Sequence, residues 1–218
     1  MIVLAHKIRI YPTDEDIANF KKYIWYKRYL YNKAIVVQKE LYLKYKGEKE
    51  KYKDFDSLDD KEKKIFYSKY YPRMGLVRNH MVRTKEKWEY NFASRLVASA
   101  AYDVTRAVGN ALNPKMPNHK MPKFKKKKNQ KMSFSLEGIK INDKNELIIP
   151  KATKSTLSGI TPENPIKFSK IKLGEKLRFQ GKLTGATISC NRNGKWFVSL
   201  IVKLDEEGEK SSRSKFYR

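Results

Sequence analysis

The sequence has few of the residues from which disulfides and metal sites are built. Cys190 is the only cysteine among 218 residues, so the chain has no intramolecular disulfide and no zinc ribbon of paired Cys-x-x-Cys motifs. The three histidines, His6, His80 and His119, lie far apart in the sequence and form no local metal-binding motif. We therefore expect neither a metal nor another cofactor.

Long apolar runs are also missing. No segment approaches the roughly 20 apolar residues that a membrane-spanning helix needs. The apolar residues 1–5 are too few for the core of a signal peptide, and no small-residue cleavage site follows them. We expect no membrane partner, no secretion, and a cytoplasmic, nucleoid-associated location in a prokaryote.

Acidic residues are scarce, and none occurs between Asp103 and Glu137. The chain has 49 Lys and Arg against 23 Asp and Glu, a formal net charge of +26, and proteins this basic usually bind nucleic acid or an anionic membrane surface. Lysines that neutralise phosphates release condensed counterions, and an aromatic residue among them can stack on a base. The acid-free stretch therefore predicts contact with a nucleic-acid backbone, although a solvated linker kept soluble by its charge is the alternative. Its basic residues are Arg106, Lys115, Lys120, Lys123, Lys125, Lys126, Lys127, Lys128 and Lys131, with Phe124 at the centre.

The spacing of apolar residues predicts helices in the first half of the chain. Residues 6–11 alternate polar and apolar positions, which predicts a short strand before Pro12. Thr13 then caps a helix that continues towards Gly47. Residues 47–83 indicate only short helices, and a clean helical pattern from Thr84 ends at Asn113.

After the lysines the period of the sequence changes to two. Strands are predicted at residues 133–136, 139–141, 146–149, 167–168, 182–190 and 195–202. The last two flank residues 191–194, which end in Asn-Gly and predict a hairpin. Successive short strands indicate a small β-barrel, which the N-terminal strand could close.

We therefore expect an α+β fold in which a helical segment is inserted into a small β-barrel. Residues 1–12 and 133–204 form the β domain, and residues 13–112 form the helical insertion. Residues 113–132, which we name the basic connector, join the two. Residues 205–218 have no period of their own and are expected to form a tail.

Five motifs of the chain resemble, in the same order, the N-terminal half of TnpB (OrfB) proteins, which are transposon-encoded RNA-guided nucleases related to the miniature type V CRISPR effectors. The motifs are Ala-His-Lys-Ile-Arg-Ile-Tyr-Pro-Thr at 5–13, Arg-Tyr-Leu-Tyr-Asn at 28–32, Asp-Val-Thr-Arg-Ala-Val-Gly-Asn at 103–110, Pro-Lys-Phe-Lys-Lys at 122–126, and Ala-Thr-Ile-Ser at 186–189 with Gly-Lys-Trp-Phe-Val-Ser at 194–199. Each motif is weak alone, but five in order across nearly the whole chain are specific.

The resemblance implies a recognition lobe in the helical insertion and a wedge-like barrel in the strands. Together these would hold a guide RNA, grip the RNA-DNA heteroduplex by its backbone and read a short motif beside the target. Ser94, Arg95 and Ser135 would lie near the motif-reading surface, while Arg28, Lys33 and the lysines from Lys123 to Lys128 would face phosphates. The expected nucleic-acid-binding residues are Lys7, Arg9, Lys27, Arg28, Tyr31, Asn32, Lys33, Ser94, Arg95, Arg106, Asn110, Lys123, Phe124, Lys125, Lys126, Lys127, Lys128 and Ser135. Tyr31 and Asn32 could equally pack between helices, and Phe124 could be a core residue.

The chain departs from the family where catalysis would begin. In a complete member, a nuclease domain with three carboxylates and a four-cysteine zinc ribbon follows within a few residues of the strand that ends near Val202. The acidic clusters of this chain lie in hydrophilic segments, whereas two-metal catalysis needs rigidly held carboxylates. We expect a non-catalytic, nucleic-acid-binding portion of a TnpB-like protein, with guide RNA and target DNA as partners. The alternatives are a nuclease-dead DNA-binding regulator and an accessory subunit that acts in trans with a nuclease-bearing chain.

Overall fold

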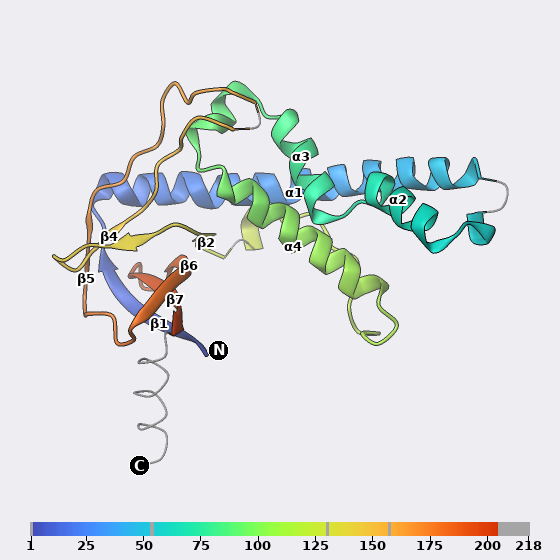
Figure 1. Cartoon of the computed structure of the whole chain (residues 1–218). Coiled ribbons are helices and arrows are strands. Elements are labelled where there is room, and N and C mark those ends of the chain that lie inside the picture. The colour runs from blue at the N-terminus through green and yellow to red at the C-terminus, as the bar shows by residue number, and fades with distance from the viewer. Residues whose placement is uncertain (1, 53–54, 130, 157, 205–218) are drawn as a thin grey trace, which may run out of the picture.

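The computed structural model describes residues 2–52, 55–129, 131–156 and 158–204. They form an α+β fold, as predicted, in which an antiparallel sheet curled into a half-barrel packs on one half of a long helix (Figure 1). The other half of that helix extends away from the sheet. The predicted tail, residues 205–218, lies outside the described residues.

The junction between the first strand and the first helix follows the sequence prediction. β1 (Val3–Tyr11) buries Ile8 and Ile10 on one face, and Pro12 separates it from α1 (Asp14–Glu50). Thr13 caps the helix, because its Oγ1 accepts a hydrogen bond from the Asp16 backbone N–H at 3.2 Å while the Asp16 carboxylate accepts one from the Thr13 N–H at 3.1 Å. α1 therefore starts where the sequence predicts.

The sheet contains seven strands in the order β2-β6-β7-β1-β5-β4-β3, so β1 lies near its centre. Within the described residues the edge strands β2 and β3 do not pair, and the sheet is an open half-barrel rather than the closed barrel that we predicted. β3 and β4 are only two and three residues long, too short to extend the ladder round to β2. The remaining strands are β2 (Ser133–Leu136), β3 (Lys140–Ile141), β4 (Glu146–Ile148), β5 (Ile171–Leu173), β6 (Gly181–Cys190) and β7 (Trp196–Leu204).

The predicted hairpin is confirmed. Cys190 pairs with Trp196, and Asn191 donates its backbone N–H to the Lys195 carbonyl at 2.9 Å. Gly194 has a φ of 73°, the left-handed conformation that a three-residue hairpin loop requires at this position.

The strand predicted at residues 167–168 is wrong. This segment is irregular, and the strand that joins the sheet is β5, a few residues later. Asn19 of α1 donates a hydrogen bond to the Lys167 carbonyl at 3.0 Å, and the Phe168 ring packs on Phe20 and Tyr23. The segment is therefore held by α1 rather than by a neighbouring strand.

The short helices expected after α1 are present as α2 (Asp60–Tyr70) and α3 (Met74–Arg83), with a single 3-10 turn, η1 (Phe55–Ser57), before α2. The helix predicted from Thr84 begins only at Arg95, as α4 (Arg95–Leu112). The intervening residues form the 3-10 turn η2 (Lys87–Asn91), because Glu89 in this turn is buried and hydrogen-bonded to side chains of α1.

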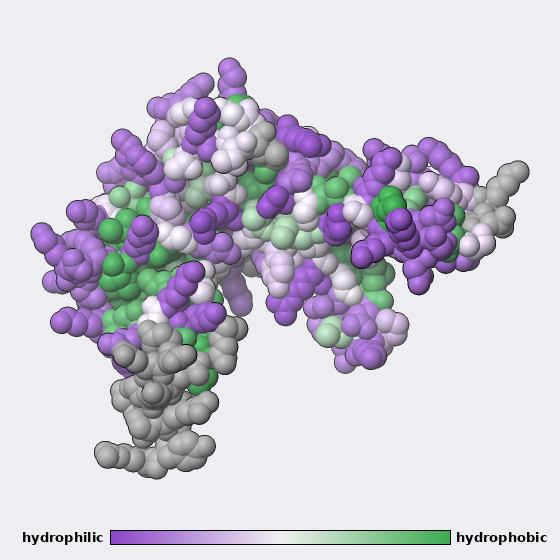
Figure 2. All heavy atoms as spheres, viewed as in Figure 1, coloured by the Kyte–Doolittle hydropathy of each residue, from purple (hydrophilic) through white to green (hydrophobic). Residues whose placement is uncertain are grey.

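One hydrophobic core joins the sheet to the helices. Phe20 of α1 lies against Phe134 of β2 and Trp196 of β7, with ring centroids 5.6 and 5.0 Å apart. α3 and α4 pack on the same stretch of α1. The last part of α1 and α2 form a projection that we name the helical arm, residues 39–71, whose visible face is mostly hydrophilic (Figures 1 and 2).

Candidate nucleic-acid interface

The basic connector runs from the end of α4 to the start of β2 as exposed, mostly irregular chain. Pro114, Pro117 and Pro122 interrupt it, and proline neither donates a backbone hydrogen bond nor permits a helical residue before it. Its regular structure among the described residues is one turn, η3 (Lys127–Asn129). The connector is held in place by contacts with α1.

Asn32 of α1 is the main attachment point of the connector. Its side-chain amide donates to the Lys125 carbonyl at 3.2 Å and accepts from the Lys125 backbone N–H at 2.8 Å. At the preceding residue, the centroid of the Tyr31 ring lies 3.5 Å from the Lys125 ammonium, a close cation-π contact. Tyr31 and Asn32 thus position a connector lysine, which differs from both direct binding of nucleic acid and packing between helices.

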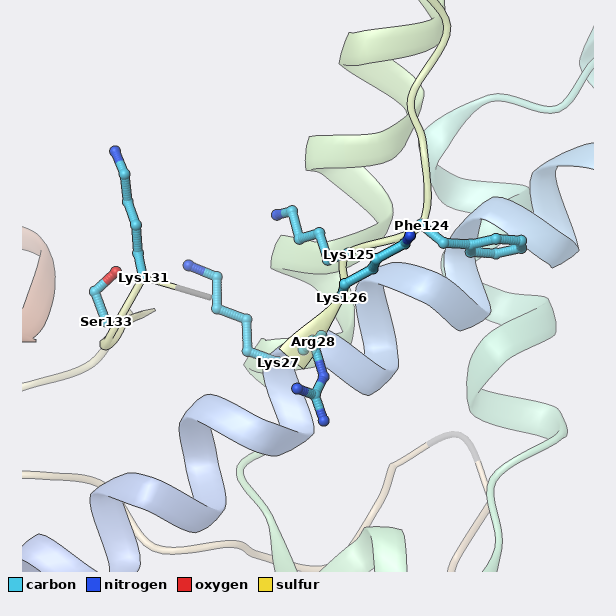
Figure 3. A pocket seen from close by; sticks show the side chains of 7 residues that line it. All are labelled: Lys27, Arg28, Phe124, Lys125, Lys126, Lys131 and Ser133. Carbon is cyan, nitrogen blue, oxygen red and sulfur yellow. The ribbon is translucent and has the colours of Figure 1, made fainter. Parts of the chain in front are cut away.

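The connector and α1 enclose a cleft of about 660 Å³. Figure 3 shows the Lys27 and Lys125 ammonium groups pointing to the same side, towards the segment that carries Lys131 and Ser133. The described lining residues include five cations and no carboxylate. They are Lys27, Arg28, Phe124, Lys125, Lys126, Lys131 and Ser133.

The Lys27 and Lys125 ammonium groups repel each other in this cleft. Burial lowers the pKa of Lys27, an effect that Asp103 partly opposes. Burial and the positive charge of Lys27 both lower the pKa of Lys125. A bound anion would favour the charged form of both amines, since an opposite charge within a few ångströms raises a lysine pKa. The cleft therefore has the electrostatics of a phosphate site.

Phe124 is not a core residue. Its side chain is 58% exposed, and in Figure 3 the ring points away from Lys27 and Lys125. An exposed ring at the rim of a cationic cleft can stack on an unpaired base. The neighbouring Lys123, Lys126, Lys127 and Lys128 are also exposed, and none of them forms an ion pair with a described residue.

Lys33, in contrast, is removed from the expected phosphate contacts. Its ammonium donates to the Glu89 carboxylate and to the Thr84 carbonyl, both at 2.8 Å, and the Glu89 side chain is fully buried. Tyr26 also donates to Glu89, at 3.1 Å. Burial and the Glu89 charge raise the pKa of Tyr29 to about 12. Lys33 thus compensates a buried carboxylate, whose isolation would be costly, and its contact with phosphate stays a prediction that would require it to leave Glu89.

A second groove lies between α4 and the edge of the sheet, where the predicted motif-reading residues gather. Arg95 and Ser135 line it, while Ser94 is exposed at the residue before α4. Arg95 forms an ion pair with Glu137 at 3.2 Å, and the Ser135 and Thr187 hydroxyls are 2.9 Å apart. Ser135 therefore has a partner on the neighbouring strand, while Arg95 contacts Glu137 through one nitrogen and keeps its other guanidinium donors for further groups.

The remaining predicted residues are distributed over two other surfaces. Arg106 lies on α4 with its guanidinium 5.9 Å from the Tyr102 ring, and Asn110 lies one turn further on. Lys7 and Arg9 are exposed on the solvent face of β1. The structure therefore brings together Lys27, Arg28 and the connector but does not gather the whole predicted set into one site.

Two residues of the cleft were absent from the predicted set. Lys131 belongs to the acid-free stretch, so charge alone could have identified it. Ser133 follows Lys131 by two residues, but it carries no charge, and its place at the cleft depends on the pairing of β2 with β6.

Metal-binding clusters and membrane-spanning helices were sought among the residues that the structure describes. These residues contain no group of three or more His, Cys, Asp or Glu side chains placed to hold a metal ion. None of their helices is both long and apolar enough to cross a membrane.

The fold and the cleft define an α+β protein with a cationic surface suited to nucleic acid. Residues 1–47 match a family model described as a helix-turn-helix domain, HTH_OrfB_IS605. The match supports an OrfB-type transposase N-terminus, and with it DNA binding in a transposase-related protein. No curated protein was found to match the chain.

The matched residues have a different local form here from the one that the family description names. They comprise β1 and most of α1, which is a single helix without a turn from Asp14 to Glu50. A helix-turn-helix places its second helix in the major groove, whereas α1 is buried on one side by the sheet over its first half. DNA contact by this segment would therefore use the side of α1 that lines the cleft, where Lys27 and Arg28 are partly exposed.

Proposed function

We propose that this chain is the nucleic-acid-binding, non-catalytic portion of a TnpB-like, transposase-related system, and that it binds a guide RNA and target DNA. The cleft grips the phosphate backbone, and the groove between α4 and β2 lies against the short motif beside the target. Any strand cleavage is supplied by a nuclease domain. The protein acts in the prokaryotic cytoplasm, at the nucleoid.

The observation that carries this proposal is the cleft formed by Lys27, Arg28 and the basic connector. Its lining is cationic and carries no carboxylate among the described residues, and the Asn32 contacts hold Lys125 in a fixed place. Backbone contacts fix the position of a protein on nucleic acid without specifying sequence. RNA guidance would leave sequence reading to base pairing, which suits a site built mainly of lysine.

Sequencing of the RNA that copurifies with the protein tests this proposal. We expect a defined, structured transcript, and addition of that transcript should increase the affinity for a DNA strand complementary to it. The proposal would be overturned if protein freed of nucleic acid bound neither RNA nor DNA at low salt.

A second candidate is a DNA-binding regulator that occupies DNA without RNA and without cutting it. The helix-turn-helix description of the family matched at residues 1–47 favours it. Sequence-specific binding to duplex DNA by RNA-free protein would select this candidate over the first. Random cellular RNA in the copurified fraction would point in the same direction.

A further inference from the structure

The solvent face of the sheet continues from the cationic cleft across four neighbouring strands. Strand pairing places Ser133 of β2 opposite Ser189 of β6, Ser189 opposite Phe197 of β7, and Phe197 opposite Arg9 of β1. Strands lie about 4.8 Å apart, so this row spans roughly 14 Å. Ser133 also lines the cleft, and the row therefore begins where the cleft ends.

A second row runs parallel to the first, two residues along each strand. It contains Ser135, Thr187, Ser199 and Lys7, again from β2, β6, β7 and β1. Alternate residues of a strand point to the same face, and the residues between the two rows, such as Phe134, Ile188 and Val198, are buried in the core. Both rows therefore belong to the face that is directed away from α1.

Both rows have hydroxyl residues on β2 and β6 and a cation on β1, and neither row contains an acidic residue. Lys7 and Arg9 are exposed, and neither pairs with a carboxylate among the described residues. Serine and threonine hydroxyls can donate to phosphate oxygens. The carboxylates of Asp103 and Glu137 line the groove beside Ser135 and Thr187, so a polyanion is best accommodated on the Ser189, Phe197 and Arg9 side.

Aromatic rings accompany both cations. The Lys7 ammonium lies 4.7 Å from the centroid of the Phe197 ring, and the Arg9 guanidinium lies 5.1 Å from that of Tyr11. Tyr11 is 50% exposed and Phe197 partly exposed. A base that stacks on either ring would displace the cation, which could then contact the phosphate of the same nucleotide. Each pair therefore offers a ring for the base and a positive charge for the phosphate.

We infer that this sheet face binds a single-stranded nucleic-acid segment that continues from the strand held in the cleft. Stacking on Phe197 and Tyr11 requires unpaired bases, because the faces of paired bases are covered inside a duplex. The inference rests on the proposed function, since the segment enters from the cleft. It extends the cleft and the groove, to which Ser133 and Ser135 already belong, across the sheet to Phe197 and Tyr11, and it specifies unpaired single strands as the ligand of this extension.

The test compares single-stranded and duplex ligands on the full chain. The double variant Phe197→Leu with Tyr11→Leu should bind a fluorescent single-stranded oligonucleotide at least about thirtyfold more weakly, since stacking contributes about 1–3 kcal/mol per base and two rings are removed. Its affinity for duplex DNA should not change. Parallel titrations with DNA and RNA oligonucleotides of the same sequence identify which polymer this face prefers.

The matched control is Tyr67→Leu, which removes an exposed tyrosine from the helical arm and should leave both affinities unchanged. Unaltered single-strand binding by the double variant would overturn the inference on the sheet face alone. A different result would count against the proposed function, namely that replacement of the connector lysines leaves duplex binding unaltered. The two failures can therefore be told apart.

Photocrosslinking of the unmodified protein keeps the test independent of how well the variants fold. A single-stranded oligonucleotide that carries bromouridine should crosslink to peptides containing Tyr11 or Phe197. Crosslinks confined to the connector would contradict the inference.

Discussion

The helical arm and the basic connector are both rich in lysine, yet their lysines have different surroundings. The arm, residues 39–71, has ten lysines and eight acidic residues, whereas the connector, residues 113–132, has eight lysines and no acidic residue. In the arm, Lys51 pairs with Glu48 at 2.7 Å, and Lys49 and Lys69 lie over the Phe55 and Tyr70 rings.

The connector lysines are instead turned outward or held against other cations, as Lys125 is against Lys27. The difference teaches that lysine content does not by itself mark a nucleic-acid interface. The absence of compensating carboxylates, together with a fixed backbone, is the informative feature. The arm is stabilised by its aromatic cluster and the connector by its contacts with α1, so the two regions can be perturbed separately.

The largest expected effect is on the stability of the arm. Phe66 is almost fully buried there, with its ring 4.9 Å from those of Phe55 and Tyr70. Phe66→Ala should lower the local unfolding free energy by about 3–5 kcal/mol, seen as faster hydrogen exchange of the α2 amides. The neighbouring Ile65→Ala, at an exposed position, is the control. If DNA affinity fell together with arm stability, the arm would be part of the interface. That result would contradict the distinction between the arm and the connector.

A smaller effect is expected from releasing the connector. Asn32→Ala removes both hydrogen bonds to the Lys125 backbone at a cost of about 1 kcal/mol, which should weaken nucleic-acid binding about fivefold. The salt dependence should stay the same, because no charge is removed. Asn118→Ala, within the connector itself, is the matched control. A changed salt slope in Asn32→Ala would show that the tether alters which phosphates are contacted.

The smallest effect concerns pH. The pKa values of Lys27 and Lys125 are lowered from 10.5, chiefly by burial, so these amines lose their charge at a lower pH than an ordinary lysine. Binding to duplex DNA should therefore weaken as the pH rises from neutrality towards 10.5. Lys27→Arg should flatten this profile, because a guanidinium stays protonated throughout. Identical profiles for the wild type, Lys27→Arg and the arm control Lys64→Arg would exclude the proposed coupling.

Local signals predicted the parts of the fold that depend on neighbouring residues. Pro12 and Thr13 fixed the junction of β1 and α1, and Gly194 fixed the β6-β7 hairpin. The start of α4 was missed because buried Glu89 bonds to α1, more than fifty residues away in the chain. The same long-range contact holds Lys33 against Glu89, which the sequence did not indicate.

The candidate site was predictable to a similar extent. The acid-free stretch identified the connector from charge alone, the family resemblance contributed Arg28, and Lys27 was expected as a basic residue of the first helix. The attachment of Lys125 to Asn32 spans 93 residues, and the place of Ser133 depends on sheet pairing. Sequence spacing carries no information about either contact.

The salt dependence of duplex DNA binding tests the central claim most directly. Two variants each remove four lysines, Lys125, Lys126, Lys127 and Lys128 from the connector or Lys61, Lys63, Lys64 and Lys69 from the arm, so their net charges are equal. The slope of log affinity against log salt should become shallower by about 3 to 4 in the connector variant and by less than about 1 in the arm variant. Equal changes in the two variants, or an unchanged slope in the connector variant, would contradict a phosphate-binding role for the connector.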